Sequence, residues 1–366
     1  MSGTTPATGP AAAHPRADDV LLRVDDLKVH FPIGGGLLGR PKAVVRAVDG
    51  VSFGVRRGRT FGIVGESGSG KSTTALAVMR LVRHTGGTIR LGEDDIGNAG
   101  GEVLRRARRR FQMVFQDPYA SLNPRKRAGD AVREALDLME AGDPSARDAR
   151  VAELFAQTGL RPEQRMLFPH QFSGGQRQRI VLARALAANP ELVVCDEPVS
   201  ALDVAIQAQI LNLMRRLQDS LGLTYLFISH NLGIVRQIAD RVGVMYLGHI
   251  VEIADADVLF RNPRHPYTKA LLSAVPHPDP DRKQERIPLK GDPPSPFNPP
   301  SGCRFHTRCP YVEDVCMSKM PALGDVLRAD PETHLAACHM VHAGSGHSKA
   351  PDAQSQALPV WHGEAR

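Results

Sequence analysis

The segment over residues 60–72 constrains the fold of this chain more than any other. Five residues with the character of a buried strand, T-F-G-I-V, run directly into G-E-S-G-S-G-K-S, which matches the pattern G-x-x-x-x-G-K-[ST]. In that pattern the glycines let the backbone turn tightly and bring its N–H groups against phosphate oxygens, and the following helix directs its positive end at the same anion. We therefore predict a strand over 60–64, a helix over 71–81 and a nucleotide phosphate between them.

Two side chains of this phosphate loop carry the expected chemistry. Lys71 should reach the β- and γ-phosphates, and the hydroxyl of Ser72 should ligate Mg²⁺. The pattern alone indicates a nucleotide and does not say how the nucleotide is used. The loop residues predicted to bind it are Gly65, Ser67, Gly68, Ser69, Gly70, Lys71, Ser72 and Thr73.

A second apolar run, L-V-V-C over residues 192–195, ends in two carboxylates, Asp196 and Glu197. A strand of this type carries its last residues to the carboxyl edge of the sheet, where α/β folds bind their ligands. Asp196 is expected to hold Mg²⁺, and Glu197 to polarise the attacking water as a general base. Acidic residues are also common at helix N-termini, but the phosphate loop elsewhere in the chain favours the catalytic interpretation.

Strands alternate with helices along most of the chain, which predicts an α/β fold with a largely parallel sheet. Residues 128–188 break this alternation because they are mostly helical in pattern, so we predict a helical subdomain inserted at about 117–188. Prolines and then four cysteines become frequent after about residue 262. The other strands are expected over 21–29, 44–53, 192–195, 225–228 and 241–246, and the other helices over 130–138, 147–158 and 201–221.

These features divide the chain into four parts. Residues 1–19 and 343–366 are small, polar and Pro-containing, and we expect both tails to be disordered. Residues 20–261 should form the nucleotide-binding domain, and residues 262–342 a separate small C-terminal domain.

Charge and hydropathy limit the class of protein. A formal net charge of +7 and an isoelectric point near 9.3 fit an anionic partner, such as a nucleotide, a nucleic acid or an anionic membrane. The basic run over residues 105–110 is interpreted as a solvated helix face. No stretch approaches the roughly 20 apolar residues that cross a bilayer, and residues 1–19 lack the apolar core of a secretory signal. We therefore expect the chain to work in the cytosol.

Further motifs bring these observations together. Residues 172–179 read F-S-G-G-Q-R-Q-R, which resembles the signature motif of ABC ATPases, although that family usually has Leu first. On this basis the chain, over about residues 20–340, is identified as a member of the ABC ATPase family. The elements that follow one another in the family's order are the phosphate loop, Gln116 in F-Q-D-P, the signature, Asp196-Glu197, S-A-L-D over 200–203, and His230.

The resemblance implies a fold and a set of roles. The fold is α/β: a P-loop ABC-type nucleotide-binding domain with a RecA-like core, an antiparallel β part and an inserted helical subdomain, here with a small Cys-containing C-terminal extension. Gln116 resembles the residue that senses the γ-phosphate and Mg²⁺, and His230 the switch histidine at the γ-phosphate. Phe31 stands where the family stacks an aromatic ring on adenine. ATP and Mg²⁺ are the implied cofactors.

In the family, the signature closes on ATP that a second subunit holds. Ser173 offers a hydroxyl, and Gly174 and Gly175 let backbone N–H groups approach phosphate at a helix N-terminus. Gln176 and Asp203 complete the residues expected at this nucleotide. The resemblance thus implies two cassettes that close head-to-tail around two ATP molecules and open after hydrolysis.

The C-terminal part resembles that of dipeptide and oligopeptide importer ATPases, on H-P-Y-T-K-A-L-L over 265–272, G-D-P-P-S-P over 291–296, C-R-F over 303–305 and R-C-P over 308–310. This likeness implies a peripheral position at the cytoplasmic face of the cell membrane. The implied partners are a second ATPase subunit, expected to be a different chain, two transmembrane permease subunits and an extracytoplasmic peptide-binding protein.

Other functions stay open at this point. The same type of motor could serve the import of nickel, glutathione or sugars, because cargo is selected by other subunits. A soluble ABC ATPase that acts on nucleic acid would fit the basic isoelectric point. Such proteins generally carry two cassettes or a long coiled coil, whereas this chain has one cassette and no sustained heptads. We therefore expect no nucleic acid partner.

Four cysteines lie close together late in the chain, with the spacing C-x5-C-x6-C-x21-C. In a cytosolic protein, clustered cysteines more often bind metal than form disulfides. Four thiolates suit Zn²⁺ or an iron–sulfur cluster, and unliganded thiols are the third alternative. Some peptide-importer ATPases carry a [4Fe–4S] cluster at matching cysteines, so the resemblance favours that cofactor on Cys303, Cys309, Cys316 and Cys338.

Overall fold

The protein is described from a computed structural model. The structure describes residues 19–34, 43–140, 142–275, 286–289, 291–325 and 334–351. The predicted disordered tails fall mainly on residues 1–18 and 352–366, which lie outside the described residues.

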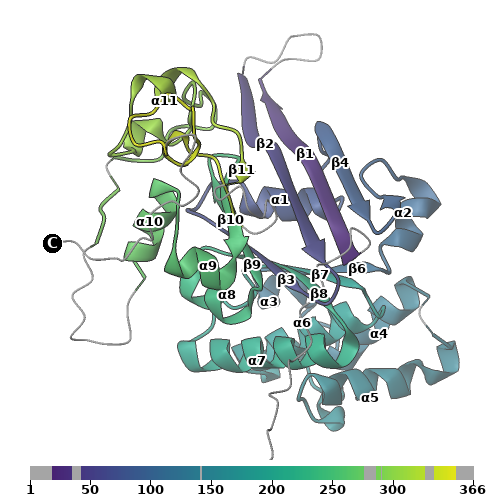
Figure 1. The fold of residues 1–366 in the computed structure, drawn as a ribbon. Helices are drawn as coiled ribbons and strands as arrows, with labels where there is room; N and C mark the ends of the chain where they lie inside the picture. The colour runs from purple at the N-terminus through teal and green to yellow at the C-terminus, as the bar shows by residue number, and fades with distance from the viewer. Residues whose placement is uncertain are drawn as a thin grey trace, which may run out of the picture.

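A central sheet forms the core of the molecule (Figure 1). Its strand order is β11-β12-β10-β9-β3-β8-β7-β6, in which β9, β3, β8, β7 and β6 run parallel and the remaining pairings are antiparallel. The strands are β3 (Thr60–Val64), β6 (Phe111–Val114), β7 (Leu192–Asp196), β8 (Thr224–Ser229), β9 (Arg241–Tyr246), β10 (His249–Asp255), β11 (Gly324–Asp325) and β12 (His334–Ala336).

A second, antiparallel sheet has the strand order β2-β1-β4-β5. Its strands are β1 (Val20–Ile33), β2 (Ala43–Arg56), β4 (Gly86–Leu91) and β5 (Asp94–Asp95). Helix α1 (Lys71–Val78) contacts β1 and β2 on one side and β7 and β8 on the other, so it lies between the two sheets. The predicted antiparallel β part is therefore present, and the first strand of the predicted core, 60–64, is confirmed at both ends.

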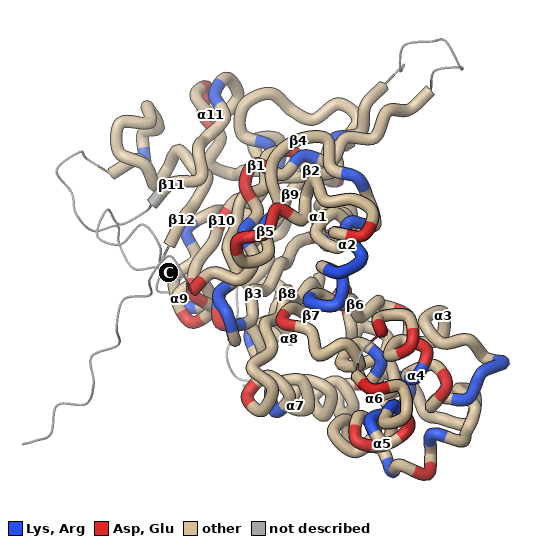
Figure 2. Tube along the Cα trace, turned by 90° about the vertical axis from the view of Figure 1, so that its right-hand side faces the viewer, with Lys and Arg blue, Asp and Glu red and all other residues tan. Residues whose placement is uncertain are grey.

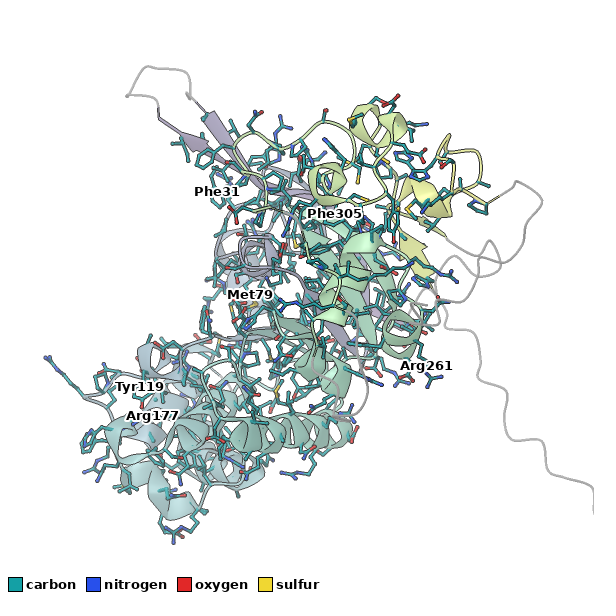
Figure 3. All side chains as sticks on the ribbon, turned by 90° about the vertical axis from the view of Figure 1, so that its left-hand side faces the viewer. Phe31, Met79, Tyr119, Arg177, Arg261 and Phe305 are labelled. Carbon is teal, nitrogen blue, oxygen red and sulfur yellow. The ribbon has the colours of Figure 1, made fainter. Side chains whose placement is uncertain are left out.

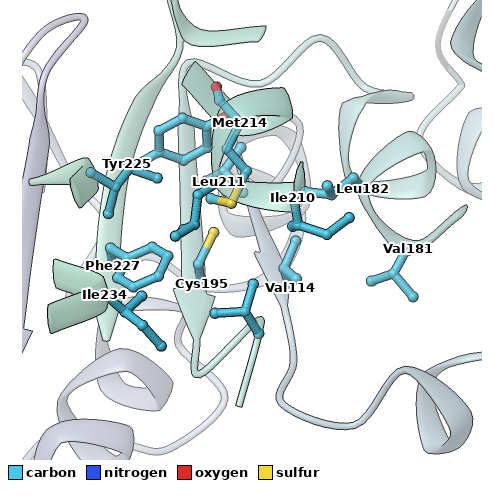
Figure 4. Packing of buried hydrophobic residues seen from close by; sticks show 14 of the residues in the cluster. Val114, Val181, Leu182, Cys195, Ile210, Leu211, Met214, Tyr225, Phe227 and Ile234 are labelled. Atoms are coloured by element: carbon cyan, nitrogen blue, oxygen red, sulfur yellow. The ribbon is translucent and has the colours of Figure 1, made fainter. Parts of the chain in front are cut away.

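The two faces of the central sheet are buried against different layers. Along β7, Leu192 and Val194 belong to the core that includes α1 and the antiparallel sheet, whereas Val193 and Cys195 belong to the core under α7 (Val204–Leu221). This alternation is what a strand buried on both faces requires. Figure 4 shows Cys195 packed among Val114, Ile210 and Met214, as expected for a small buried residue.

The inserted helices form a compact group at one end of the molecule (Figure 1). They are α3 (Pro118–Ser121), α4 (Ala128–Leu138), α5 (Arg147–Gln157) and α6 (Gly174–Leu186), with short 3₁₀ turns at Pro144–Ala146, Pro162–Met166 and Pro169–Gln171. Helices α4 and α5 both pack on α6. Three helices lie outside this group and before residue 262, namely α2 (Gly101–Ala107), α8 (Leu232–Ile238) and α9 (Ala256–Arg261), in addition to α1 and α7.

All four predicted helices differ from their expected bounds: α4 begins two residues earlier, α5 ends one residue earlier, and α1 and α7 each differ by three residues. Helix α1 stops at Val78 rather than at residue 81, because Arg80 adopts a left-handed conformation, with φ of 56°. Helix α7 begins at Val204 rather than at residue 201, because the side chain of Asp203 accepts a hydrogen bond from Ile206 N–H and caps the helix.

The C-terminal part differs from the predicted separate domain. Strand β12 pairs with β10, so this part extends the central sheet, while α10 (Pro266–Ser273), α11 (Asp314–Ser318) and the 3₁₀ turns His306–Arg308 and His339–Val341 pack at its edge. Residues 343–351, predicted as part of a disordered tail, are packed: His347 Nε2 lies 2.8 Å from the carbonyl oxygen of Tyr311, and Ser348 N–H donates to Glu313. Among the described helices, none has the length and apolar character to span a membrane.

Candidate functional site

The phosphate loop connects β3 to α1, and its glycines are required by close backbone approaches. A Cβ atom on Gly70, which has φ of 105°, would lie 2.2 Å from the carbonyl oxygen of Ala47. A Cβ atom on Gly65 would lie 2.1 Å from the carbonyl oxygen of Met245. The loop is therefore wedged between β2 and the end of β9, and larger residues at these two positions would force it open.

Lys71 lies under this loop. Its Nζ donates to the carbonyl oxygens of Gly65 at 2.9 Å and Glu66 at 2.8 Å, and the residue is 5% exposed. Burial lowers the pKa of Lys71, while the negative charges of Glu197, Asp196 and Glu66 oppose that shift. The ammonium group is thus placed where the loop would enclose a phosphate.

Ser72 and Asp196 meet across the site. The Ser72 hydroxyl donates to Asp196 Oδ1 at 3.0 Å, although the two residues come from α1 and from the end of β7. Burial raises the pKa of Asp196, and the hydrogen bond from Ser72 and the charge of Lys71 oppose the rise. A carboxylate and a hydroxyl side by side are oxygen donors of the kind that Mg²⁺ prefers, so these residues fit the predicted metal site in their chemistry.

Glu197 is held at both of its carboxylate oxygens. Gln116 Nε2 donates to Oε2 at 3.0 Å, and His230 Nδ1 lies 2.9 Å from Oε1. Gln116 follows β6, Glu197 follows β7 and His230 follows β8, and these three strands are neighbours in the sheet. The structure therefore brings together, at the carboxyl edge, three residues that the sequence singled out separately.

The signature segment forms a helix N-terminus. Ser173 caps α6: its hydroxyl accepts from Gln176 N–H at 3.3 Å, and its own N–H donates to Gln176 Oε1 at 3.0 Å. Arg177 lies over the ring of Tyr119, 3.8 Å from its centroid, and donates to the carbonyl oxygen of Pro169, which fixes the start of the helix (Figure 3). Ser173 is exposed, and Gly174 is partly so.

The structure does not bring every predicted residue to the phosphate loop. Within the described ranges, no hydrogen bond or ion pair joins residues 173–176 or Asp203 to that loop. Phe31 lies near the end of β1 and is 39% exposed (Figure 3). The other predicted loop residues are found as expected in or beside the loop: Ser67 and Gly68 exposed, Ser69 buried, and Thr73 partly buried in α1.

The four late cysteines line one small pocket of about 10 Å³, together with His265, Phe305 and other residues of the C-terminal part. They are free thiols. Burial raises the pKa of Cys303 to about 11 and that of Cys338 to about 12. Across the part of the chain that the structure describes, no group of three or more His, Cys, Asp or Glu is arranged to hold a metal ion. The predicted iron–sulfur cluster therefore has sulfur donors of the right kind near one another, but no ligand geometry supports it.

Two residues that contact the phosphate loop were not predicted. Tyr267 and Arg308, both from the C-terminal part, bond to Glu66 inside the loop. No spacing rule could have found them, because 201 and 242 residues separate them from Glu66 in the chain. Tyr267 lies in the H-P-Y segment and Arg308 in the R-C-P motif, two motifs that supported only the likeness to peptide-importer ATPases.

Comparison with known proteins agrees with this geometry. A family model described as "ABC transporter" matches residues 48–200, and one described as "Oligopeptide/dipeptide transporter, C-terminal region" matches residues 251–316. The fold is shared with the dimeric structure of MJ0796, a bacterial ABC transporter cassette, at a TM-score of 0.57 and 25% identity over 64% of this chain and 98% of that one. It is also shared with cbiO1 from Clostridium perfringens, at a TM-score of 0.57 and 25% identity over 66% and 91% of the two chains.

The sequence relatives cover nearly the whole chain. The oligopeptide transport ATP-binding protein AppF of Bacillus subtilis is 51% identical over 88% of this chain and 98% of its own length. The "Probable peptide ABC transporter ATP-binding protein y4tS" of Sinorhizobium fredii is 47% identical over 93% and 96% of the two chains. Fold, site and relatives agree, and the chain belongs to the ABC transporter family of ATPases, in the branch of the oligopeptide transport ATP-binding proteins.

Proposed function

We propose that this chain is the ATP-hydrolysing motor subunit of an importer that carries di- and oligopeptides across the cytoplasmic membrane. The observation that carries this proposal is the likeness to the oligopeptide transport ATP-binding protein AppF, which extends over 98% of that protein and includes the C-terminal region. The likeness therefore covers both the catalytic site and the part of the chain specific to peptide systems.

The residues of the site divide the chemistry among them. Lys71 and the loop N–H groups would bind the β- and γ-phosphates of ATP, and Ser72 and Asp196 would hold Mg²⁺, which supplies positive charge to the same oxygens. Glu197 would accept the proton of the attacking water. Gln116 and His230 would orient its carboxylate, because each already contacts one of the two oxygens.

The signature segment would act on a second cassette. Ser173 is exposed at the N-terminus of a 13-residue helix, and the helix dipole and free N–H groups there favour an anion. We propose that residues 173–176, with Asp203, contact the ATP held by the opposite subunit, and that Phe31 stacks on the adenine of its own subunit. ATP then stabilises the closed pair, and hydrolysis removes the shared anion.

The complete system would contain several further chains. The proposed partners are a second, different ATPase subunit, two transmembrane permease subunits and an extracytoplasmic peptide-binding protein, which place this chain at the cytoplasmic face of the membrane. The peptide cargo is selected outside this chain, so it is tested on the assembled complex.

The test is ATP hydrolysis by the complex in proteoliposomes. Binding protein loaded with a di- or oligopeptide should stimulate hydrolysis and peptide uptake, whereas nickel, glutathione and sugars should not. A complex that carries Glu197→Gln in this chain controls for contaminating ATPases. Stimulation by one of the other cargoes, with none by peptides, would assign the transporter to that cargo.

The basic run over residues 105–110 does not favour the nucleic acid alternative. Arg105 and Arg106 pair with Glu102, Arg105 also reaches Glu140, and Arg110 pairs with Asp94 and Glu191. Figure 2 shows these basic positions beside acidic ones around α2. A surface compensated in this way attracts phosphate backbones weakly. Binding of RNA or DNA that weakens steeply with salt would contradict the proposal.

We also propose that Cys303, Cys309, Cys316 and Cys338 hold a [4Fe–4S] cluster in the cell. The support is chemical: four thiols gathered on one pocket in a Pro-rich segment that contributes little apolar core. Anaerobic purification tests it, with iron and sulfide assayed per chain and Cys309→Ser as the comparison. A colourless protein that contains zinc, or no metal at all, would rule the cluster out.

A further inference from the structure

The C-terminal part of the chain reaches the phosphate loop through Arg308. Its guanidinium group donates to both carboxylate oxygens of Glu66, with Nη1 2.7 Å from Oε2 and Nη2 3.3 Å from Oε1. The Arg308 side chain is 5% exposed and that of Glu66 is 28% exposed. A bidentate pair with a buried guanidinium group orients the Glu66 carboxylate and compensates its charge, and a lysine could not reproduce its geometry.

A second contact holds the backbone of the same loop residue. The hydroxyl of Tyr267 accepts a hydrogen bond from Glu66 N–H at 2.9 Å. Tyr267 is fully buried, and its ring packs against Tyr246 and Phe305 with centroids 4.7 and 5.4 Å apart. Figure 3 shows Phe305 where the C-terminal segments meet the rest of the molecule. Glu66 is therefore held at its side chain and at its backbone by the C-terminal part.

The position of Glu66 bears directly on Lys71. The carbonyl oxygen of Glu66 accepts from Lys71 Nζ at 2.8 Å, so a displacement of Glu66 also displaces an acceptor of the phosphate-binding lysine. In addition, Glu66 places a carboxylate inside a loop that has to bind an anion. Arg308 compensates this charge at close range, and without it the carboxylate would repel the incoming phosphates.

We propose that Arg308 is a positioning residue for ATP: by pairing with Glu66 it neutralises and orients the phosphate loop, so the C-terminal part helps set the affinity of the cassette for nucleotide. Arg308 lies between Cys303 and Cys309, in a segment that also joins β2 through the ion pair of Arg304 with Asp49 at 3.1 Å. Residues 303–309 thus contact both the pocket lined by the four cysteines and the phosphate loop. The inference rests on ATP binding by the cassette and not on the identity of the cargo.

The test measures the Kd of a non-hydrolysable ATP analogue with Mg²⁺ on the full-length chain. Arg308→Gln should weaken binding by about tenfold, because it leaves the Glu66 carboxylate uncompensated. Adding Glu66→Gln to that variant should restore most of the lost affinity, since the repelling charge is then gone. Arg308→Lys should lie between Arg308→Gln and the unchanged protein. In the assembled complex, the loss should appear as a raised KM for ATP with kcat changed much less.

Two further variants separate this role from general destabilisation. Tyr267→Phe removes the hydroxyl that accepts from Glu66 N–H but keeps the ring, and it should also weaken analogue binding. This variant therefore tests the inference even where Arg308 variants do not fold. Arg147→Gln breaks the ion pair of Arg147 with Asp137 in the helical subdomain, in which the two side chains are 2.7 Å apart and that of Arg147 is 11% exposed, and it should leave the Kd unchanged. The inference fails if Arg308→Gln binds the analogue within twofold of the unchanged protein, or if the double variant binds more weakly than Arg308→Gln alone. Weak binding by Lys71→Ala in the same assay shows that the measured Kd reports binding at the phosphate loop.

Discussion

At the scale of single residues, the surroundings of Glu197 decide what its carboxylate can do. Gln116 and His230 contact its two oxygens, and its backbone has a positive φ of 48° at the end of β7. A residue other than glycine rarely adopts such a conformation. Here it places the Glu197 side chain between those of Gln116 and His230 at the edge of the sheet. The carboxylate is thereby held in a defined orientation at the carboxyl edge of the sheet.

Glu197→Gln should abolish turnover and preserve ATP binding. The amide has nearly the same shape but cannot accept the proton of the attacking water, so hydrolysis should fall by about 10³-fold. Turnover is measured as phosphate release, and binding as retention of labelled ATP by the complex. Glu191→Gln, at the start of the same strand and paired with Arg57 and Arg110, is the matched control and should hydrolyse ATP normally. Full activity of Glu197→Gln would show that another group is the base.

Lys71→Ala should act on binding instead. It removes the buried ammonium group that lies against the carbonyl oxygens of Gly65 and Glu66, so the Kd for ATP should rise by about tenfold or more. Equilibrium titration with labelled ATP checks this. Lys126→Ala, which breaks an exposed ion pair with Glu134, is expected to bind as the unchanged protein does.

At the scale of secondary-structure elements, most strands of the parallel sheet could be predicted from the sequence and the pairing of the C-terminal part could not. The apolar strands before Glu197 and His230 were predicted, and parallel strands end at a common edge. Strand β6, which precedes Gln116, was not predicted, and Gln116 and His230 were singled out by resemblance to the ABC ATPase family. The joining of β12 to β10 could not be foreseen, because a three-residue strand has no periodic signal. The contact of Arg308 with Glu66 was beyond prediction for a similar reason: it depends on tertiary packing alone.

Helix α10 shows how one buried histidine can make an element sensitive to pH. His265 is its N-cap, and its Nδ1 accepts from Tyr267 N–H at 3.1 Å, which requires that nitrogen to be unprotonated. Burial lowers the pKa of His265 to about 4; the charge of Glu252 opposes this shift and that of Lys269 adds to it. The unfolded chain binds this proton near pH 6.5, so stability is lost as the pH falls from about 6.5 towards 4.

His265→Asn should therefore flatten the acid limb of the stability curve. Asparagine keeps a capping oxygen but has no group that takes up a proton in this range. Between pH 7.5 and pH 5 the free energy of unfolding of the variant should therefore fall by about 2 kcal/mol less than that of the unchanged protein. Urea denaturation at the two pH values measures the difference. His170→Asn, which replaces an exposed histidine, is the comparison variant. Equal losses in all three proteins would show that His265 does not titrate in this range.

At the scale of the whole molecule, the site of one chain is proposed to be completed by another. The phosphate loop follows β3, and Asp196 and Glu197 stand at the end of β7, all at the carboxyl edge of the central sheet, whereas Ser173 caps α6. Helix α6 belongs to the helical group at the end of the molecule (Figure 1). Each proposed ATP site thus takes its loop from one cassette and its signature helix from the other. A substitution in the signature of one chain should then weaken the binding of the nucleotide held by the other chain.

Ser173→Asp tests that arrangement without unfolding helix α6. Aspartate caps a helix as well as serine does, but its charge would face the γ-phosphate held by the opposite cassette. Ser173→Asn is the neutral control that keeps the cap. In the assembled complex with its sister ATPase, photolabelling with an azido-ATP, resolved by chain, should show labelling of the sister chain reduced by about tenfold with Ser173→Asp and far less with Ser173→Asn. Labelling of this chain's own loop should be nearly unchanged, because in the proposed pairing that loop faces the signature of the sister chain. Loss of labelling on this chain instead would place Ser173 at its own nucleotide and refute the head-to-tail pairing.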